Sequence, residues 1–113
     1  MNIGLIDAIP ATEVEMEGAT GVRMRIAVGE PQGAPNFVMR VFDVEPGGHT
    51  PHHGHDFEHE VFVLAGKGTL VEEDGGESPL VPGVVAFVPA GAVHQFRADA
   101  AEGLRFICVV PRG

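Results

Sequence analysis

Short runs of alternating apolar and polar residues, each closed by glycine or proline, are the feature that most constrains the fold of this chain. Residues 22–28, VRMRIAV, alternate apolar and basic side chains, which is the period of a strand with one buried face. Further strand-like runs cover residues 36–45, 59–66, 68–73, 83–91, 93–98 and 104–111. No segment of ten or more residues combines helical periodicity with helix caps. The pattern therefore predicts an all-β domain, either a sandwich or a barrel.

Turn residues set the expected ends of these strands. Pro46-Gly47-Gly48 predicts the end of the strand over 36–45, and Asp74-Gly75-Gly76 predicts a hairpin after the strand over 68–73. The 113 residues are enough for one domain and too few for two. Residues 1–20 have the least pattern, so we expect an N-terminal arm that packs on, or exchanges with, a partner subunit. Residues 21–113 form the barrel or sandwich.

Charge and composition exclude several classes of function. The formal net charge of −9 comes from 16 acidic and 7 basic residues, and an acidic surface repels the phosphates of nucleic acids. No apolar run is long enough to span a membrane. Cys108 is the only cysteine, and the first ten residues lack the features of a signal peptide. We therefore expect a cytoplasmic protein that binds neither nucleic acid nor membrane.

Histidines are concentrated in one segment. Five of the 6 histidines lie between positions 49 and 59, in and before the sequence HHGHDFEHE. In an extended strand, residues two apart share a face, so His53 and His55 can point into one site and hold a metal. His94 follows a turn built by Pro89 and Gly91, and can reach that pair from the next strand. His49 and His52 have no clear ligand position, and we expect them to be exposed.

Two spaced motifs make this chain resemble the cupins. The first cupin motif, G(X)5HXH(X)3,4E(X)6G, maps to Gly47, His53, His55 and Gly66. The second, G(X)5PXG(X)2H(X)3N, maps to Gly83, Pro89, Gly91 and His94, with Ala98 in place of the final asparagine. The resemblance covers residues 21–111 and is strongest to small single-domain cupins with a four-histidine manganese site. It implies a cupin double-stranded β-helix, which is a jelly-roll barrel.

The fourth ligand of the first motif is open to two interpretations. Counting three residues after His55 gives His59, and counting four gives Glu60. His59 is favoured, because only this choice leaves six residues before Gly66 and because the four-histidine relatives use this histidine. The metal ligands expected from the resemblance are therefore His53, His55, His59 and His94. Glu58 and Glu60 are then expected to be surface groups or to accept the free N–H of a ligand imidazole.

A pocket beside the metal is expected from the flanking strands. Arg40 interrupts an apolar strand, and we expect it to contact an anion or a substrate carboxylate. The apolar candidates for the lining are Phe42, Phe62 and Phe106. If the even-numbered residues of 104–111 face inward, Cys108 lies in the same pocket.

The resemblance implies one divalent transition metal per chain and a small-molecule substrate. Manganese is expected first and iron second, with zinc, nickel or copper as alternatives. The preferred function is a dioxygenase-like oxidoreductase that cleaves a carbon–carbon bond. The alternative is a metal-dependent isomerase, cyclase or lyase without redox chemistry, or a small-ligand sensor without turnover. Exposed sheet edges predict a homodimer.

Overall fold

A single curled sheet makes up almost the whole molecule in the computed structural model, which describes residues 1–113. The strands are β1 (Thr12–Glu13), β2 (Thr20–Val28), β3 (Phe37–His49), β4 (His59–Gly66), β5 (Gly68–Glu72), β6 (Glu77–Leu80), β7 (Val85–Val88), β8 (His94–Ala98) and β9 (Leu104–Pro111). Two short 3-10 helices, η1 (Ile6–Ala8) and η2 (Glu30–Gln32), complete the fold. Neither helix is long or apolar enough to cross a membrane.

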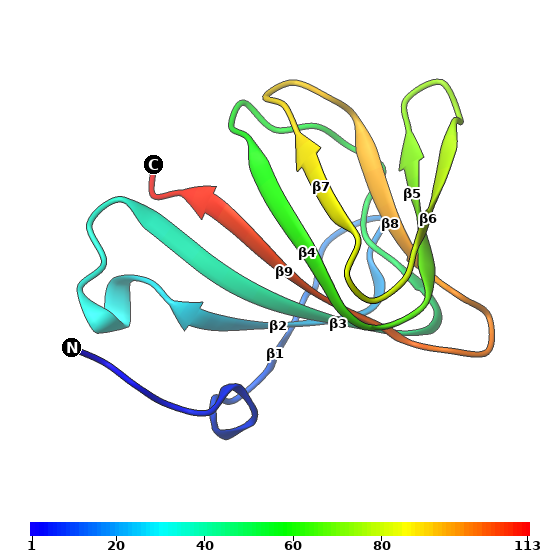
Figure 1. The fold of residues 1–113 in the computed structure, drawn as a ribbon. Coiled ribbons are helices and arrows are strands. Elements are labelled where there is room, and N and C mark those ends of the chain that lie inside the picture. The colour runs from blue at the N-terminus through cyan, green and yellow to red at the C-terminus, as the bar shows by residue number, and fades with distance from the viewer.

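The strand order is β6-β5-β8-β3-β9-β4-β7, with β2 on β3 and β1 on β2. Every pairing is antiparallel, and the sheet curls into an open barrel (Figure 1). The expected all-β barrel is therefore confirmed. The long strand β3 holds the barrel together, because it pairs with β2 and β9 along its first part and with β8 at His49.

The core lies inside the curl and follows the alternation of the strands. On β9, the even-numbered side chains Leu104, Phe106, Cys108 and Val110 are buried, whereas their odd-numbered neighbours are only partly covered. On β4, His59, Val61 and Val63 face inward, and Val63 is fully buried, whereas Ala65 follows a register shift and is exposed. Burying each such apolar side chain contributes roughly 1.5–3 kcal/mol, which makes this interior the main source of stability.

Strand β3 continues past the point where the sequence predicts its end. Pro46-Gly47-Gly48 lies within the strand, which reaches His49. The pairing with β2 jumps from Val22↔Val44 to Thr20↔His49, so the extra residues form a bulge rather than a turn. Gly48 has to be glycine here, because a Cβ would collide with the carbonyl oxygen of Thr20.

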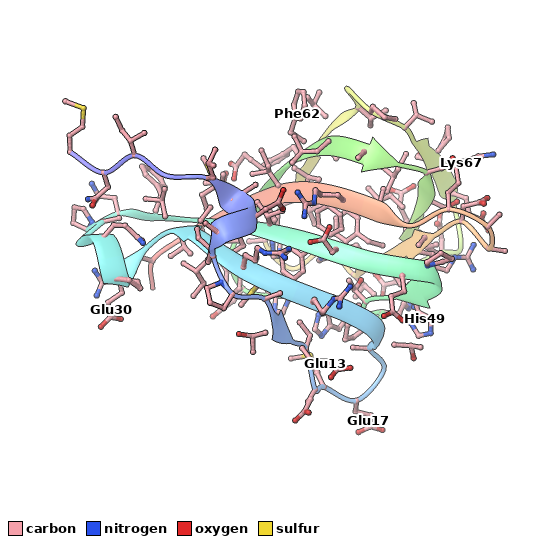
Figure 2. All side chains as sticks on the ribbon, turned by 90° about the horizontal axis from the view of Figure 1, so that it is seen from below. Glu13, Glu17, Glu30, His49, Phe62 and Lys67 are labelled. Atoms are coloured by element: carbon pink, nitrogen blue, oxygen red, sulfur yellow. The ribbon has the colours of Figure 1, made fainter.

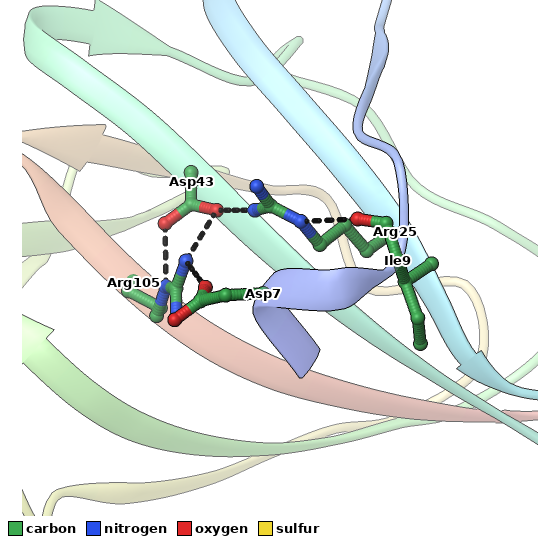
Figure 3. Close-up of polar contacts among 5 residues, drawn as sticks. All are labelled: Asp7, Ile9, Arg25, Asp43 and Arg105. Atoms are coloured by element: carbon green, nitrogen blue, oxygen red, sulfur yellow. Dashed lines mark hydrogen bonds and ion pairs between the residues drawn. The ribbon is translucent and has the colours of Figure 1, made fainter. Parts of the chain in front are cut away.

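The N-terminal segment around η1, residues 6–9, lies across the outer face of β2, β3 and β9 in the single chain (Figure 2). The Arg25 and Arg105 guanidinium groups both bind the Asp43 carboxylate, at 2.6 and 2.7 Å. Arg105 also pairs with Asp7 of η1 at 3.0 Å, and Arg25 donates a hydrogen bond to the carbonyl of Ile9 (Figure 3). These contacts attach residues 7–9 to the barrel of their own chain.

Candidate metal centre and cavity

Backbone pairing brings the two histidine segments together. The His53 N–H donates to the His94 carbonyl at 3.1 Å, and the His94 N–H donates back to His53 at 3.0 Å. The Gly91 N–H donates to the His55 carbonyl at 2.6 Å. These backbone hydrogen bonds hold the turn over residues 89–92 against the loop that precedes β4. As a result, His94 at the start of β8 faces the His53 and His55 side chains.

The imidazole rings of four histidines form one cluster. The ring centroids of His53 and His55 are 4.3 Å apart, and those of His59 and His94 are 5.1 Å apart. The His55–His59, His55–His94 and His53–His94 separations are 5.2, 6.1 and 6.3 Å. Rings that bind one ion through nitrogens at about 2.1 Å have centroids roughly 4–7 Å apart, so the cluster has the required size.

The clustered rings do not form a closed ligand set. Nowhere in the chain are three or more His, Cys, Asp or Glu side chains arranged so that their ligating atoms could hold an ion directly. Binding therefore requires the imidazoles to turn their nitrogens toward a common point. The ring separations leave room for this, because each ring is already in contact distance of at least one other.

The surroundings of three clustered imidazoles, those of His55, His59 and His94, favour the neutral form. Burial, together with repulsion from a protonated His94 and from Arg40, lowers the pKa of His59 to about 4. Burial also lowers the pKa of His94, although the hydrogen bond to the Ala92 carbonyl acts in the opposite direction. The pKa of His55 is lowered by burial and by the neighbouring histidines. Neutral imidazoles have a free lone pair, which a transition metal requires.

The hydrogen bonds of the His94 and His59 rings involve Nδ1 and leave Nε2 available to bind a metal. The His94 Nδ1–H donates to the Ala92 carbonyl at 2.9 Å, which leaves the lone pair on Nε2. The His59 Nδ1 lies 3.2 Å from the Cys108 sulfur, while its Nε2 is buried without any partner. A buried polar atom without a partner is rare and costly. The donor set therefore fits a divalent transition metal in its chemistry.

The remaining histidines and the two glutamates lie outside the cluster. Along residues 52–60, even-numbered residues are exposed and odd-numbered residues are at least partly covered. His52 is exposed, as expected, and hydrogen bonds to the Glu72 carbonyl. His49 was also expected to be exposed but is half-buried, because its ring lies against the Thr50 carbonyl and the Gln95 side chain at the barrel edge (Figure 2). Glu60 is exposed, and a hydrogen bond that its protonated carboxyl donates to the Glu58 carboxylate raises the pKa of Glu60. The two carboxyl groups therefore contact each other. The groups that bond to ligand imidazoles are the Ala92 carbonyl and the Cys108 thiol.

A cavity of about 410 Å³ opens beside the four histidines. Its wall contains three phenylalanines in a continuous stack, with Phe42–Phe106 centroids at 5.2 Å and Phe96–Phe106 centroids at 4.5 Å. Arg40 and Cys108 lie between this aromatic wall and the histidines. The cavity is thus apolar along one side and polar at the histidine end, which is typical of a small-molecule site.

Four of the five predicted pocket residues line this cavity, and one does not. Arg40, Phe42, Phe106 and Cys108 are part of the lining. Phe62 is 45% exposed and projects outward, so its expected place in the pocket is wrong (Figure 2). The reason is strand alternation, because His59, Val61 and Val63 occupy the inner face of β4 and leave Phe62 on the outer face.

Other lining residues were not expected from the sequence. Phe96 lies two residues after His94 on the same face of β8, so alternation contained the signal for it. The mouth is formed by residues 12–16, including Val14 and Met16, next to Met24 of β2. No pattern in residues 1–20 predicted this, because β1 is only two residues long and its position depends on pairing with β2.

Comparisons with known proteins agree on one family. Residues 40–110 match the family described as Cupin domain. The polyketide cyclase RemF from Streptomyces resistomycificus has a similar structure, with a TM-score of 0.93 and 35% identity over 98% of this chain and 79% of that chain. A cupin-2 domain from Rhodospirillum rubrum matches with a TM-score of 0.80 and 30% identity over 93% of this chain and 69% of that one.

A curated relative has a different name and a longer chain. The 1-methylthio-D-xylulose 5-phosphate methylsulfurylase of Rhodospirillum rubrum is 38% identical over 72 residues, which is 64% of this chain and 46% of that protein. The chain therefore spans less than half the length of this relative. Proteins similar to this chain include enzymes with unlike activities, so the family alone does not determine the reaction.

Proposed function

Because this chain belongs to the Cupin domain family, we propose that it is a metal-dependent cyclase for a small, mostly apolar substrate with several carbonyl groups. The observation that carries the proposal is the apolar cavity, which ends on four imidazoles and has an aromatic wall. The similarity to a polyketide cyclase over 98% of the chain supports it. The methylsulfurylase carries less weight, because this chain covers only 46% of that protein.

One divalent ion is proposed to bind to His53, His55, His59 and His94. Imidazole ligands suit manganese, iron, zinc, nickel and copper, and manganese and then iron remain the first choices. When bound, the ion supplies a Lewis acid that polarises a substrate carbonyl. The chain contributes the imidazole ligands and the hydrogen bonds that orient them, which His94 Nδ1–H donates to the Ala92 carbonyl and His59 Nδ1–H donates to the Cys108 sulfur.

The cavity wall is proposed to hold the substrate in a folded conformation. A chain with several carbonyl groups can close many rings, and the enzyme selects one by fixing which atoms meet. Phe42, Phe96 and Phe106 provide a flat apolar surface for this purpose. The same surface keeps water away from the reacting carbons.

Proton transfer is restricted by the residues that line the cavity. Burial raises the pKa of the Cys108 thiol, so it stays protonated at neutral pH and does not act as a base. Among lining residues other than the four histidines, Glu13 and Glu15 at the mouth are the carboxylates that can accept a proton. The proton released during ring closure is therefore proposed to leave toward the mouth.

A dioxygenase-like oxidoreductase is the second candidate. The set of four imidazoles favours it, because these ligands also suit redox-active iron and manganese. The buried Cys108 sulfur, 3.2 Å from His59, provides a marker that separates the two candidates. Repeated oxygen chemistry at the cluster would place reactive oxygen species next to this thiol and oxidise it.

An assay with small linear triketones tests the two candidates together. A cyclase that closes an aromatic ring lowers the substrate mass by one water and consumes no oxygen. An oxygenase consumes oxygen and produces fragments that contain it, and intact-mass analysis then shows oxygen added at Cys108. We expect dehydrated product, no oxygen uptake and unmodified Cys108, with chelator-treated protein and His94→Ala as inactive controls. Oxygen uptake that depends on protein, metal and substrate would contradict the cyclase proposal.

A further inference from the structure

Arg40 is the only lysine or arginine that lines the cavity. It lies on β3 opposite Cys108 of β9, and it takes part in none of the ion pairs of the molecule. By contrast, Arg25 and Arg105 share the Asp43 carboxylate on the outer face. The Arg40 charge is therefore not compensated by any acidic side chain.

Only some of the N–H groups of the Arg40 guanidinium have hydrogen-bond partners. Its Nη2 donates to the Cys108 sulfur at 3.3 Å, and its central carbon lies 5.0 Å from the centroid of the Phe42 ring. Its Nε is buried and has no hydrogen-bond partner. An ionised group with an unused buried donor is costly unless a ligand supplies the missing acceptor.

No neighbouring group balances the charge of Arg40 or accepts a hydrogen bond from its free Nε–H. Of the Arg40 donors, the buried Cys108 sulfur accepts a hydrogen bond from Nη2 only, and no acidic side chain forms an ion pair with Arg40. Glu13 and Glu15 line the mouth but are exposed and form no ion pair with Arg40. A ligand with an anionic oxygen would satisfy both the charge and the free Nε–H.

We propose that Arg40 binds an ionised oxygen of the substrate, carried on a flat conjugated skeleton that lies against Phe42 and Phe106. The chemical class comprises carboxylates, enolates and phenolates with a single delocalised charge. This inference rests on the proposed function, because it identifies the substrate class of the same cavity. It makes Arg40 a residue that determines specificity.

The composition of the cavity narrows the class further. Phosphate monoesters carry close to two charges and are bound by several donors at once. The cavity offers one cation, the formal net charge of the chain is −9, and one wall is aromatic. A singly charged aromatic or enolic anion matches these properties, whereas a sugar phosphate does not.

Binding of 2-naphthoate and its neutral analogue 2-naphthamide tests the proposal by calorimetry. The two probes have the same ring system and differ in charge at the polar end. We expect the wild-type protein to bind naphthoate about 10-fold more tightly than naphthamide, as expected for a hydrogen bond between charged groups. Arg40→Gln should abolish this preference and leave naphthamide affinity unchanged. Arg23→Gln is the matched control, because Arg23 also lacks an ion pair but is exposed on the outer face.

Two further measurements keep the outcome unambiguous. Arg40→Met removes the charge and the unpaired donor together, so it provides the same test if Arg40→Gln fails to fold. Metal content is measured for each variant, because an ion at the histidines attracts naphthoate equally in wild type and variant. Equal affinity of the wild type for both probes, or an unchanged preference in the Arg40 variants, would overturn the proposal. If the preference for naphthoate over naphthamide depends on Arg40 but triketones are not cyclised, only the cyclase proposal is contradicted.

Discussion

At the scale of single residues, the site depends on how each histidine is surrounded. His59 and His94 are 4% and 7% exposed, and the first has a buried Nε2 without a partner. His52 is exposed, although it directly precedes His53 in the chain. Burial favours the neutral imidazole in the first two, and a metal needs the neutral form. Position in the fold therefore separates candidate ligands from other histidines more clearly than position in the sequence.

The metal-free protein should lose stability in mild acid. The pKa of His59 is about 4 in the folded state and 6.5 in the absence of perturbation, so the unfolded state binds a proton more readily. Stability should therefore fall as the pH decreases from about 6.5 to about 4, and this contribution is absent above pH 6.5. Thermal unfolding in the presence of a chelator measures the effect. His59→Gln should flatten this part of the pH profile, and parallel profiles of variant and wild type would contradict the assignment.

At the scale of elements, the alternation of apolar and polar residues and the glycines and prolines between the runs predicted the strands well. The runs 59–66 and 104–111 are strands β4 and β9 with the same bounds, because each has a regular buried face and a glycine or proline at its end. The expected hairpin at Asp74-Gly75-Gly76 is confirmed by the pairing of β5 with β6. The same rule failed at residues 46–48, because a bulge can absorb a proline and two glycines without ending the strand.

Two parts of the site could not be predicted from local pattern. The mouth of the cavity comes from residues 12–16, whose place depends on long-range pairing with β2. The Cys108–His59 and Cys108–Arg40 contacts join three strands, and only the register of β9 with β3 and β4 reveals them. Single-strand patterns give the face of a residue but not its partner on another strand.

Gly66 should be the glycine least tolerant of substitution. Its φ is +84°, and an added Cβ would collide with the Gly103 carbonyl, which already accepts a hydrogen bond from Lys67. Gly75 has a similar φ of +88° with open space around it. Gly75→Ala should cost roughly 1 kcal/mol from backbone strain, and Gly66→Ala on the order of 3 kcal/mol or more. Chemical denaturation measures both, and equal losses would show that the carbonyl contact is unimportant.

At the scale of the whole molecule, one curled sheet leaves edges and apolar patches on its surface. On the outer face, Phe62 pairs with Val85 and Glu60 with Phe87, and Phe62, Val85 and Phe87 are 45, 70 and 62% exposed. Residues 7–9 are attached to their own barrel through Arg25 and Arg105. An apolar outer face of this kind is typical of a surface that contacts another protein.

We propose that the chain forms a homodimer, with this outer face of β4 and β7 or the N-terminal segment at the contact. Light scattering should give twice the chain mass of 11.9 kDa at micromolar concentration. Phe87→Glu should shift the mass toward that of one chain if the outer face forms the contact, because a buried unpaired carboxylate is costly. Lys67→Glu, a charge change at an exposed site, is the control. A monomeric mass of the wild-type protein would contradict the proposal.

The central claim is that four histidines bind one divalent ion beside an apolar cavity. Metal content after dialysis, measured by plasma mass spectrometry, tests it in wild type and in His53→Ala, His55→Ala, His59→Ala and His94→Ala. We expect about one ion per chain in the wild type and a loss of at least about 10-fold in affinity in each variant. His52→Ala and Glu60→Gln should retain the ion. Loss of metal in Glu60→Gln together with full retention in His59→Ala would contradict the claim.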